Sequence, residues 1–187
     1  MSKFYTGVGS RDLPDNIKHL MVRLAIELSE RGYTCTSATQ GGADLAFQEG
    51  CSIAKGEAEV YIPWSGFNKE QSKPFNGEFI KFFTPNESSF IKARDYLVDK
   101  DIITWFDKMK QGAQKLHCRN YYQVKGKGDV LSDVCFYYCN ETKSGEPTGG
   151  TRTAVKICDE EGVKSFNLLH YNSWELLYKI VEDLDTK

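Results

Sequence analysis

The sequence lacks any hydrophobic run near the roughly 18 consecutive apolar residues that a membrane-spanning helix needs. It also lacks an amino-terminal series of basic, apolar and small residues of the secretory type, so we expect a cytoplasmic protein without a membrane partner. Hydrophobic residues make up 40% of the 187 residues and charged residues 27%, which is ordinary for a globular protein. No repeat, low-complexity tract or linker is visible, and we expect one domain over residues 1–187.

Metal-binding and disulfide patterns are also missing. The cysteines stand singly in apolar surroundings without a Cys-x-x-Cys pair, and no histidine follows them at zinc spacing. We therefore expect buried, reduced thiols, no metal site and no cofactor. The six cysteines are Cys35, Cys51, Cys118, Cys135, Cys139 and Cys158.

An excess of positive charge is absent as well. The formal net charge of -2 provides no overall field to attract a polyanion, so the composition disfavours a nucleic-acid partner, duplex DNA above all. A locally basic stretch nevertheless contains Lys108, Lys110, Lys115, Arg119, Lys125 and Lys127.

What is present is an alternation of strand-like and helix-like segments. The clearest helical pattern runs from 14 to 31, where apolar residues recur at three- and four-residue spacing and Gly32 follows. Strands that alternate with helices pair in parallel through right-handed crossovers. We predict the α/β class, with a Rossmann-like open, mostly parallel sheet and helices on both faces. The predicted strands are 4–6, 33–37, 59–63, 133–139 and 166–169, and further helices are predicted at 45–50, 151–161 and 174–181.

The segment from about 64 to 115 interrupts this alternation. Turn signals occur at 66–68, 74–77 and 84–86, and a helix is predicted at 88–98. We interpret the segment as an irregular insertion that covers the ligand cleft.

Three glycine loops each join a predicted strand to a predicted helix. In a parallel sheet such loops gather at the carboxyl ends of the strands, where open α/β sheets bind ligands. Glycine lets backbone amides approach a phosphate, and the following helix adds partial positive charge. Any one loop could be a plain tight turn, but three in register predict a phosphate site. The residues concerned are Gly7, Gly9, Ser10 and Arg11; Gly41, Gly42 and Asp44; and Thr148, Gly149, Gly150, Thr151 and Arg152.

Arginine, amide and aromatic side chains complete the candidate site. Arg11 and Arg119 carry guanidinium groups that match phosphate oxygens, although either could be a solvated surface residue. Asn120 and Gln123 can read a base or ribose edge, and Trp64 is either a stacking platform or a core residue. Asp44 accepts from ribose hydroxyls or caps its helix.

In their order along the chain, these motifs resemble the superfamily that unites the DNA-processing protein DprA with the LOG phosphoribohydrolases, often called SLOG. The resemblance is strongest to short stand-alone members from bacteria and phages, and it rests on Gly7-Val8-Gly9-Ser10-Arg11, Gly42-Ala43-Asp44, Arg119-Asn120 with Gln123, and Thr148-Gly149-Gly150-Thr151. It implies a Rossmann-type nucleotide pocket in an often dimeric protein, so we expect a homo-oligomer. The ligand expected from it is a phosphate-bearing nucleotide, such as an NAD-derived or cyclic nucleotide signal, and a phage member would counter host nucleotide signalling.

The chain departs from the hydrolase branch of that superfamily. That branch reads Pro-Gly-Gly-x-Gly-Thr followed by a catalytic glutamate, whereas here Thr148 replaces the proline, Arg152 the later glycine and Lys156 the glutamate. We therefore expect a protein that senses or sequesters a nucleotide and is not an enzyme. Two alternatives stay open: DprA-like binding of single-stranded DNA, and hydrolysis of an N-glycosidic or phosphoester bond with acid–base groups among Asp44, Glu49, Glu146 and His117.

Overall fold

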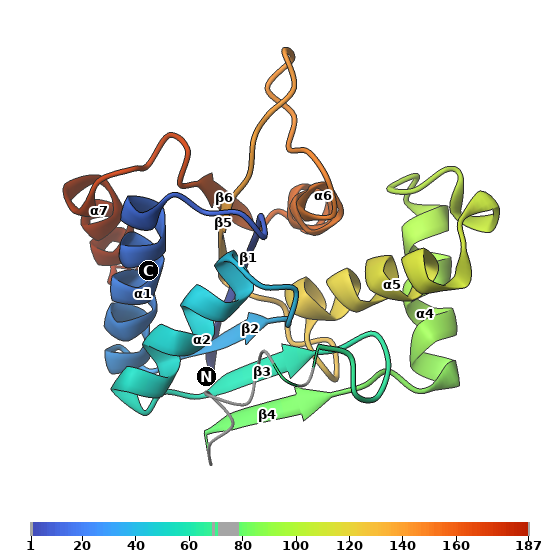
Figure 1. The fold of residues 1–187 in the computed structure, drawn as a ribbon, viewed down its shortest axis with the longest axis horizontal. Coiled ribbons are helices and arrows are strands. Elements are labelled where there is room, and N and C mark those ends of the chain that lie inside the picture. The colour runs from blue at the N-terminus through green and yellow to red at the C-terminus, as the bar shows by residue number, and fades with distance from the viewer. Residues whose placement is uncertain (1, 69, 71–78, 187) are drawn as a thin grey trace.

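The computed structural model describes residues 2–68, 70 and 79–186, and the turn predicted at 74–77 lies outside the described residues. One parallel sheet forms the centre of the molecule (Figure 1), with the strand order β4-β3-β2-β1-β5-β6. This arrangement confirms the predicted Rossmann-like α/β class. The strands are β1 (Lys3–Gly9), β2 (Tyr33–Ser37), β3 (Ala58–Tyr61), β4 (Ile80–Phe83), β5 (Val134–Tyr138) and β6 (Lys164–Asn167).

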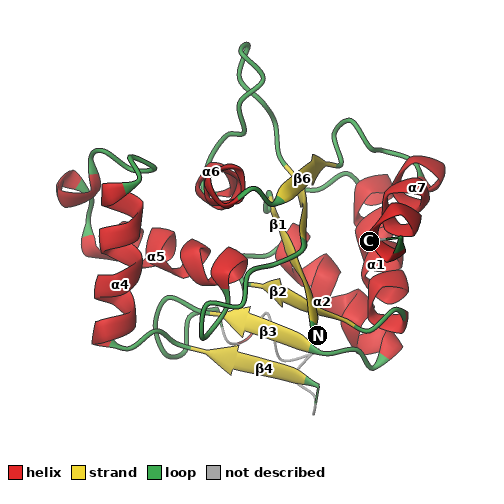
Figure 2. Cartoon of the chain, turned by 180° about the vertical axis from the view of Figure 1, so that it is seen from behind, coloured by secondary structure: helices red, strands yellow, loops and turns green. Residues whose placement is uncertain are grey.

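Helices cover both faces of the sheet, as Figures 1 and 2 show. On one face α1 (Asp15–Glu30), α2 (Ala43–Ala54) and α7 (Trp174–Asp185) enclose a core that includes Tyr5, Phe47 and Phe136. On the other face α5 (Gln111–Lys125) and α6 (Thr151–Glu161) enclose a second core, and α4 (Glu87–Asp99) packs outside α5. The central strands contribute residues to both cores, which explains the continuous apolar run at 133–139.

The order of the strands reverses between β1 and β5. The chain proceeds outward from β1 to β4 and then returns, so that β5 lies beside β1. Such a switch point leaves a crevice outside the carboxyl ends of the two strands, where ligands bind in open α/β sheets. Gly9 at the end of β1 pairs in register with Tyr138 at the end of β5. The first and third glycine loops therefore leave the sheet side by side.

The segment predicted to be irregular contains more regular structure than its sequence indicates. Strand β4 pairs in parallel with β3, and α4 begins one residue before the helix predicted at 88–98. Asn86 caps α4 because its side chain accepts a hydrogen bond from the Ser89 amide at 2.9 Å. A short 3-10 helix, η2 (Phe106–Lys108), follows. Strand β4 spans four residues, which is too short to show an alternating pattern.

Helix α5 is fastened across the sheet by buried hydroxyl groups. The carbonyl of Gln123 is one of the last four in the helix, which have no partner within it. It accepts hydrogen bonds from the Thr6 hydroxyl at 2.8 Å and the Thr36 hydroxyl at 2.5 Å, which come from β1 and β2. This contact fixes the position of the α5 residues one turn earlier, Arg119 and Asn120.

The first and second glycine loops pack directly on each other. Gly42 has a φ of +49°, and a Cβ atom there would lie 2.2 Å from the Ser10 carbonyl oxygen and 2.3 Å from that of Arg11. The Ala43 amide donates to the same Ser10 carbonyl at 3.0 Å, and the Ser10 amide donates to the Tyr138 carbonyl at 2.7 Å. Glycine at position 42 is therefore required by close backbone packing.

We predict that Gly42→Ala destabilises the protein by about 2 kcal/mol or more, because the left-handed backbone and the blocked Cβ position both oppose the side chain. In a thermal unfolding experiment the melting temperature should fall by roughly 4 °C or more. Gly112→Ala is the matched control, because a Cβ at Gly112 meets nothing closer than Trp64 at 3.9 Å. Alanine favours the helix there, so the control should melt at the same temperature or higher. Equal melting of Gly42→Ala and the wild type would contradict the tight packing.

Candidate functional site

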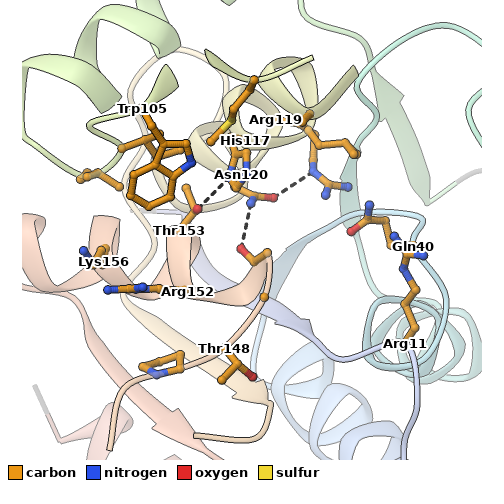
Figure 3. Close-up of a pocket in the computed structure, with 18 of the residues that line it drawn as sticks. Arg11, Gln40, Trp105, His117, Arg119, Asn120, Thr148, Arg152, Thr153 and Lys156 are labelled. Atoms are coloured by element: carbon orange, nitrogen blue, oxygen red, sulfur yellow. Dashed lines mark hydrogen bonds between the residues drawn. The ribbon is translucent and has the colours of Figure 1, made fainter. Parts of the chain in front are cut away.

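A cavity of about 530 Å³ opens beside the β1–β5 switch point (Figure 3), a volume in the range of small-molecule sites. Its lining contains a polar, partly cationic set of side chains and an apolar set, which we call the polar wall and the apolar wall. A smaller recess adjoins the cavity and shares Gln40, Arg119, Asn120 and Gly150 with it. The polar wall comprises Arg11, Gln40, His117, Arg119, Asn120, Thr142, Thr148, Gly149, Gly150, Arg152, Thr153 and Lys156, and the apolar wall Ile102, Ile103, Trp105, Met109, Ala113, Leu116 and Pro147.

The structure brings together most of the residues that the sequence nominated. They come from the first loop, the start of α2, helix α5 and the third loop, which are far apart in the sequence. The cavity is lined by Arg11, Arg119, Asn120, Thr148, Gly149, Gly150 and Arg152, and the recess also by Gly9, Asp44, Gln123 and Thr151, whereas Gly7, Ser10, Gly41, Gly42 and Trp64 line neither.

Arg119 is the most deeply buried cation of the cavity. Its side chain is 3% exposed, and its Nε donates to the Asn120 Oδ1 at 3.1 Å. Its Nη1 is buried and has no hydrogen-bond partner among the described residues. Burial lowers the pKa of Arg119 to about 10, against the opposing effect of Asp44, so the group stays charged at neutral pH. Because buried N–H groups are almost always paired in native proteins, this Nη1 is a donor that a bound water or a ligand acceptor could satisfy.

Asp44 lies in the recess close enough to Arg119 and Arg11 to interact with both charges. Its carboxylate accepts a hydrogen bond from the Gln40 amide at 3.0 Å, so it orders the second loop. Burial raises the pKa of Asp44 to about 6, while Arg119, the Gln40 hydrogen bond and Arg11 lower it. Among the described residues Asp44 forms no ion pair within 4 Å. The two arginines are thus screened by this carboxylate without being neutralised.

The third glycine loop is the most open of the three. A Cβ atom at Gly149 or Gly150 would meet nothing within 4 Å, and no side chain caps the start of α6. The first amides of a helix have no partner within it and carry partial positive charge. Asn120 fastens the loop to α5 by donating to the Gly150 carbonyl at 3.0 Å. In the first two loops, by contrast, Gly9 and Gly42 pack closely against backbone atoms, and Gly7 packs against the Phe47 ring.

The acid–base candidates are dispersed. His117 lines the cavity, and its Nδ1 lies 2.8 Å from the Thr153 Oγ1. Burial and then the charge of Arg119 lower the pKa of His117, which favours the neutral ring. Glu146 pairs with Arg152 at 2.7 Å, and Glu49 pairs with Lys18 at 3.5 Å away from the cavity lining. Lys156 also lines the cavity.

The tryptophan at the cavity is Trp105, whereas the sequence nominated Trp64. Trp105 is 51% exposed and belongs to the apolar wall. Trp64 packs edge-on against Phe67, with ring centroids 4.7 Å apart, and lines a separate groove beside α5. Sequence reasoning missed Trp105 because it follows α4 without a glycine or strand motif. The available signal was an indole next to the apolar pair Ile102 and Ile103.

The described residues offer no metal centre or membrane span. No group of three or more His, Cys, Asp or Glu side chains could hold a metal ion within the described ranges. Likewise, none of the described helices is long and apolar enough to cross a membrane. The six cysteines are free and buried, as the sequence predicted.

No protein-family model and no curated protein matches the chain. Among solved structures it is similar to DNA processing protein A from Helicobacter pylori, with 14% sequence identity and a TM-score of 0.43. The match covers 97% of this chain and 81% of that one, whose structure is described for its unique single-stranded DNA binding mode. This finding contradicts the expectation that a nucleic-acid partner is disfavoured, and we withdraw that expectation.

We predict that Asp44 makes the stability of the protein depend on pH. Its pKa is raised from 3.8 to about 6 on folding, so the protein loses stability as pH rises from about 4 through 6. Asp44→Asn removes this titration. We expect the free energy of unfolding of the variant minus that of the wild type, measured in urea, to rise by roughly 2 to 3 kcal/mol between pH 4 and pH 7. A relative stability that does not change with pH would show that the carboxylate is not buried in this way.

Proposed function

We propose that the cavity binds a phosphate-bearing nucleotide, such as an NAD-derived or cyclic nucleotide signal, and that the protein senses or sequesters it. The observation that carries this proposal is the buried guanidinium of Arg119, whose Nη1 has no hydrogen-bond partner among the described residues. The group lines a cavity of nucleotide size, so a ligand anion would satisfy it.

The proposed phosphate site lies between Arg119, Arg11 and the open third loop. A charge-assisted hydrogen bond from a guanidinium group contributes about 1.5 to 3 kcal/mol. The unpaired amides at the start of α6 favour the same negative charge. Asn120 is engaged with Arg119 at one end of its amide and with Gly150 at the other, so we assign it to positioning these two parts of the site.

The apolar wall supports the same proposal for the base. Trp105 and Met109 offer an indole face and a polarisable thioether, both of which pack well against planar rings. Lys156 adds positive charge where the hydrolase branch has a glutamate, which favours holding an anion over LOG-type cleavage.

Four expectations from the sequence stay predictions. They are membership of the SLOG superfamily, a single domain, a homo-oligomer and a phage role against host nucleotide signalling.

A second candidate is a nucleotide within a single strand of DNA, the ligand class named for the Helicobacter pylori protein. The half-exposed Trp105 favours it, because an indole on the same cavity as Arg152 and Lys156 could stack a base while cations hold its phosphates. The two candidates share their phosphate chemistry and differ in whether the ligand extends beyond the cavity.

Titration calorimetry against a panel of NAD-derived nucleotides, cyclic nucleotides and a ten-residue single strand tests both candidates. A strand that uses several phosphates should lose affinity steeply as salt rises, whereas a nucleotide held by one phosphate should lose it weakly. If nothing on the panel binds more tightly than about 1 mM, near -4 kcal/mol, the proposed function is wrong.

For the ligand that binds, we predict that Arg119→Met weakens affinity about 10- to 100-fold, because the charge-assisted hydrogen bond is lost. Circular dichroism should show an intact fold, since methionine fills similar space without burying a charge. Arg94→Met is the matched control: Arg94 is an exposed guanidinium that pairs with Asp95 away from the cavity lining. Equal affinity of the Arg119 variant and the control would rule out Arg119 as the phosphate ligand.

A further inference from the structure

We infer that the cavity recognises a nucleoside flanked by two separate anionic groups, as in a nucleoside 3′,5′-bisphosphate. This inference rests on the proposed function and deepens it, because it assigns a second anion position to the same cavity. The first position is the one at Arg119 and Arg11, and the second is at Arg152 and Lys156 on α6.

Two arginines of the cavity wall each keep a buried N–H without a partner in the part of the chain that the structure describes. These are the Nη1 of Arg119 and the Nε of Arg152. Figure 3 shows them on different sides of the cavity, with Asn120 and Thr153 between them. Arg119 lies on the side of Arg11 and Gln40, and Arg152 lies on the side of Lys156. The unsatisfied donors therefore define two positions.

The second position gathers positive charge at the start of α6. Arg152 and Lys156 stand four residues apart on α6, which places them on one face of the helix where like charges repel. Arg152 is also in the first helical turn, where the helix dipole opposes a cation. Lys156 has no ion-pair partner within the described ranges. An anion bound between these two side chains would relieve both repulsions.

The chain itself places a carboxylate on this second position. The Nη2 of Arg152 donates to the Glu146 Oε2 at 2.7 Å, and the two side chains are 40% and 52% exposed. An ion pair this exposed contributes little to stability, so an incoming anion can replace it. Glu146 belongs to the hairpin between β5 and α6, which projects from the body of the molecule in Figure 1. We assign Glu146 as an internal competitor for the second anion.

Neither position is explained by the packing of the protein. At Arg119, the described neighbours leave one N–H unpaired, and at Arg152 the pair with Glu146 leaves the Nε unpaired. The apolar wall with Trp105 and Met109 borders the same cavity and leaves room for a base. A nucleoside with one phosphate on each side matches this arrangement, whether it is free or part of a single strand.

The test compares 5′-monophosphates with 3′,5′-bisphosphates of adenosine, guanosine, cytidine and uridine by titration calorimetry. At least one bisphosphate should bind tenfold or more tightly than its monophosphate. Arg152→Ala should abolish this preference by weakening the bisphosphate about tenfold, while the monophosphate changes less than about twofold. Glu146→Gln should strengthen the bisphosphate several-fold. Arg119→Met should weaken both ligands, and Arg94→Ala should weaken neither.

The outcomes separate this inference from the proposed function. Binding of monophosphates and bisphosphates with equal affinity, or an equal loss for both in Arg152→Ala, overturns the second anion position and leaves nucleotide binding intact. No binding of either class at millimolar concentration, together with no binding on the wider panel, overturns both. A ten-residue single strand that binds more tightly than the bisphosphate, and that also weakens in Arg152→Ala, identifies the strand as the source of the two phosphates. The melting temperature of ligand-free Arg152→Ala should be unchanged or raised, and a marked fall would show a structural role instead.

Discussion

The position of helix α5 depends on one backbone carbonyl, that of Gln123, which the Thr6 and Thr36 hydroxyls bind from the sheet. A helix end buried against a sheet needs partners for its last carbonyl groups. Strands β1 and β2 supply them for Gln123, while the Gly126 and Ser132 amides donate to the Tyr122 and Val124 carbonyls. Arg119 lies four residues before Gln123, about one turn of the helix from this anchor. The guanidinium is thus held by a rigid element whose position is set by buried hydrogen bonds, as a preorganised binding group requires.

Burial lowers the pKa of Arg119 and raises the pKa of Asp44, so it favours the neutral form of each group. The desolvation of these two charges costs free energy that the remaining fold must offset, a common relationship between binding sites and stability. The hydrophobic cores on the two faces of the sheet provide that stability. A bound anion would reduce the cost at Arg119 directly, so occupancy and stability are expected to rise together.

The sequence sufficed for the elements whose pattern is local. The apolar spacing of α1, the glycine that ends it and the buried run of β5 each appear within a few residues, and the structure contains all three. Arg119, Asn120 and Gly150, which the sequence predicted as site residues, also line one cavity.

The openness of a glycine loop, in contrast, depends on what packs against it. Gly42 and Gly149 look alike in the sequence, yet one is pressed between carbonyl groups and the other faces open space. The place of Trp105 at the cavity depends on the course of the segment after α4, and the ion pair of Arg152 with Glu146 depends on the hairpin before α6. No local sequence pattern predicts the course of either segment.

The positions of the cysteines make their thiols probes of local unfolding. Cys35 and Cys51 are buried on the α1–α2 face of the sheet, whereas Cys118, Cys135, Cys139 and Cys158 are buried on the α5–α6 face. A buried thiol reacts with an alkylating reagent only when the surrounding structure opens. The two sets of thiols therefore report separately on the two layers. Mass spectrometry of partly alkylated protein would distinguish loosening around the cavity from loosening of the opposite layer.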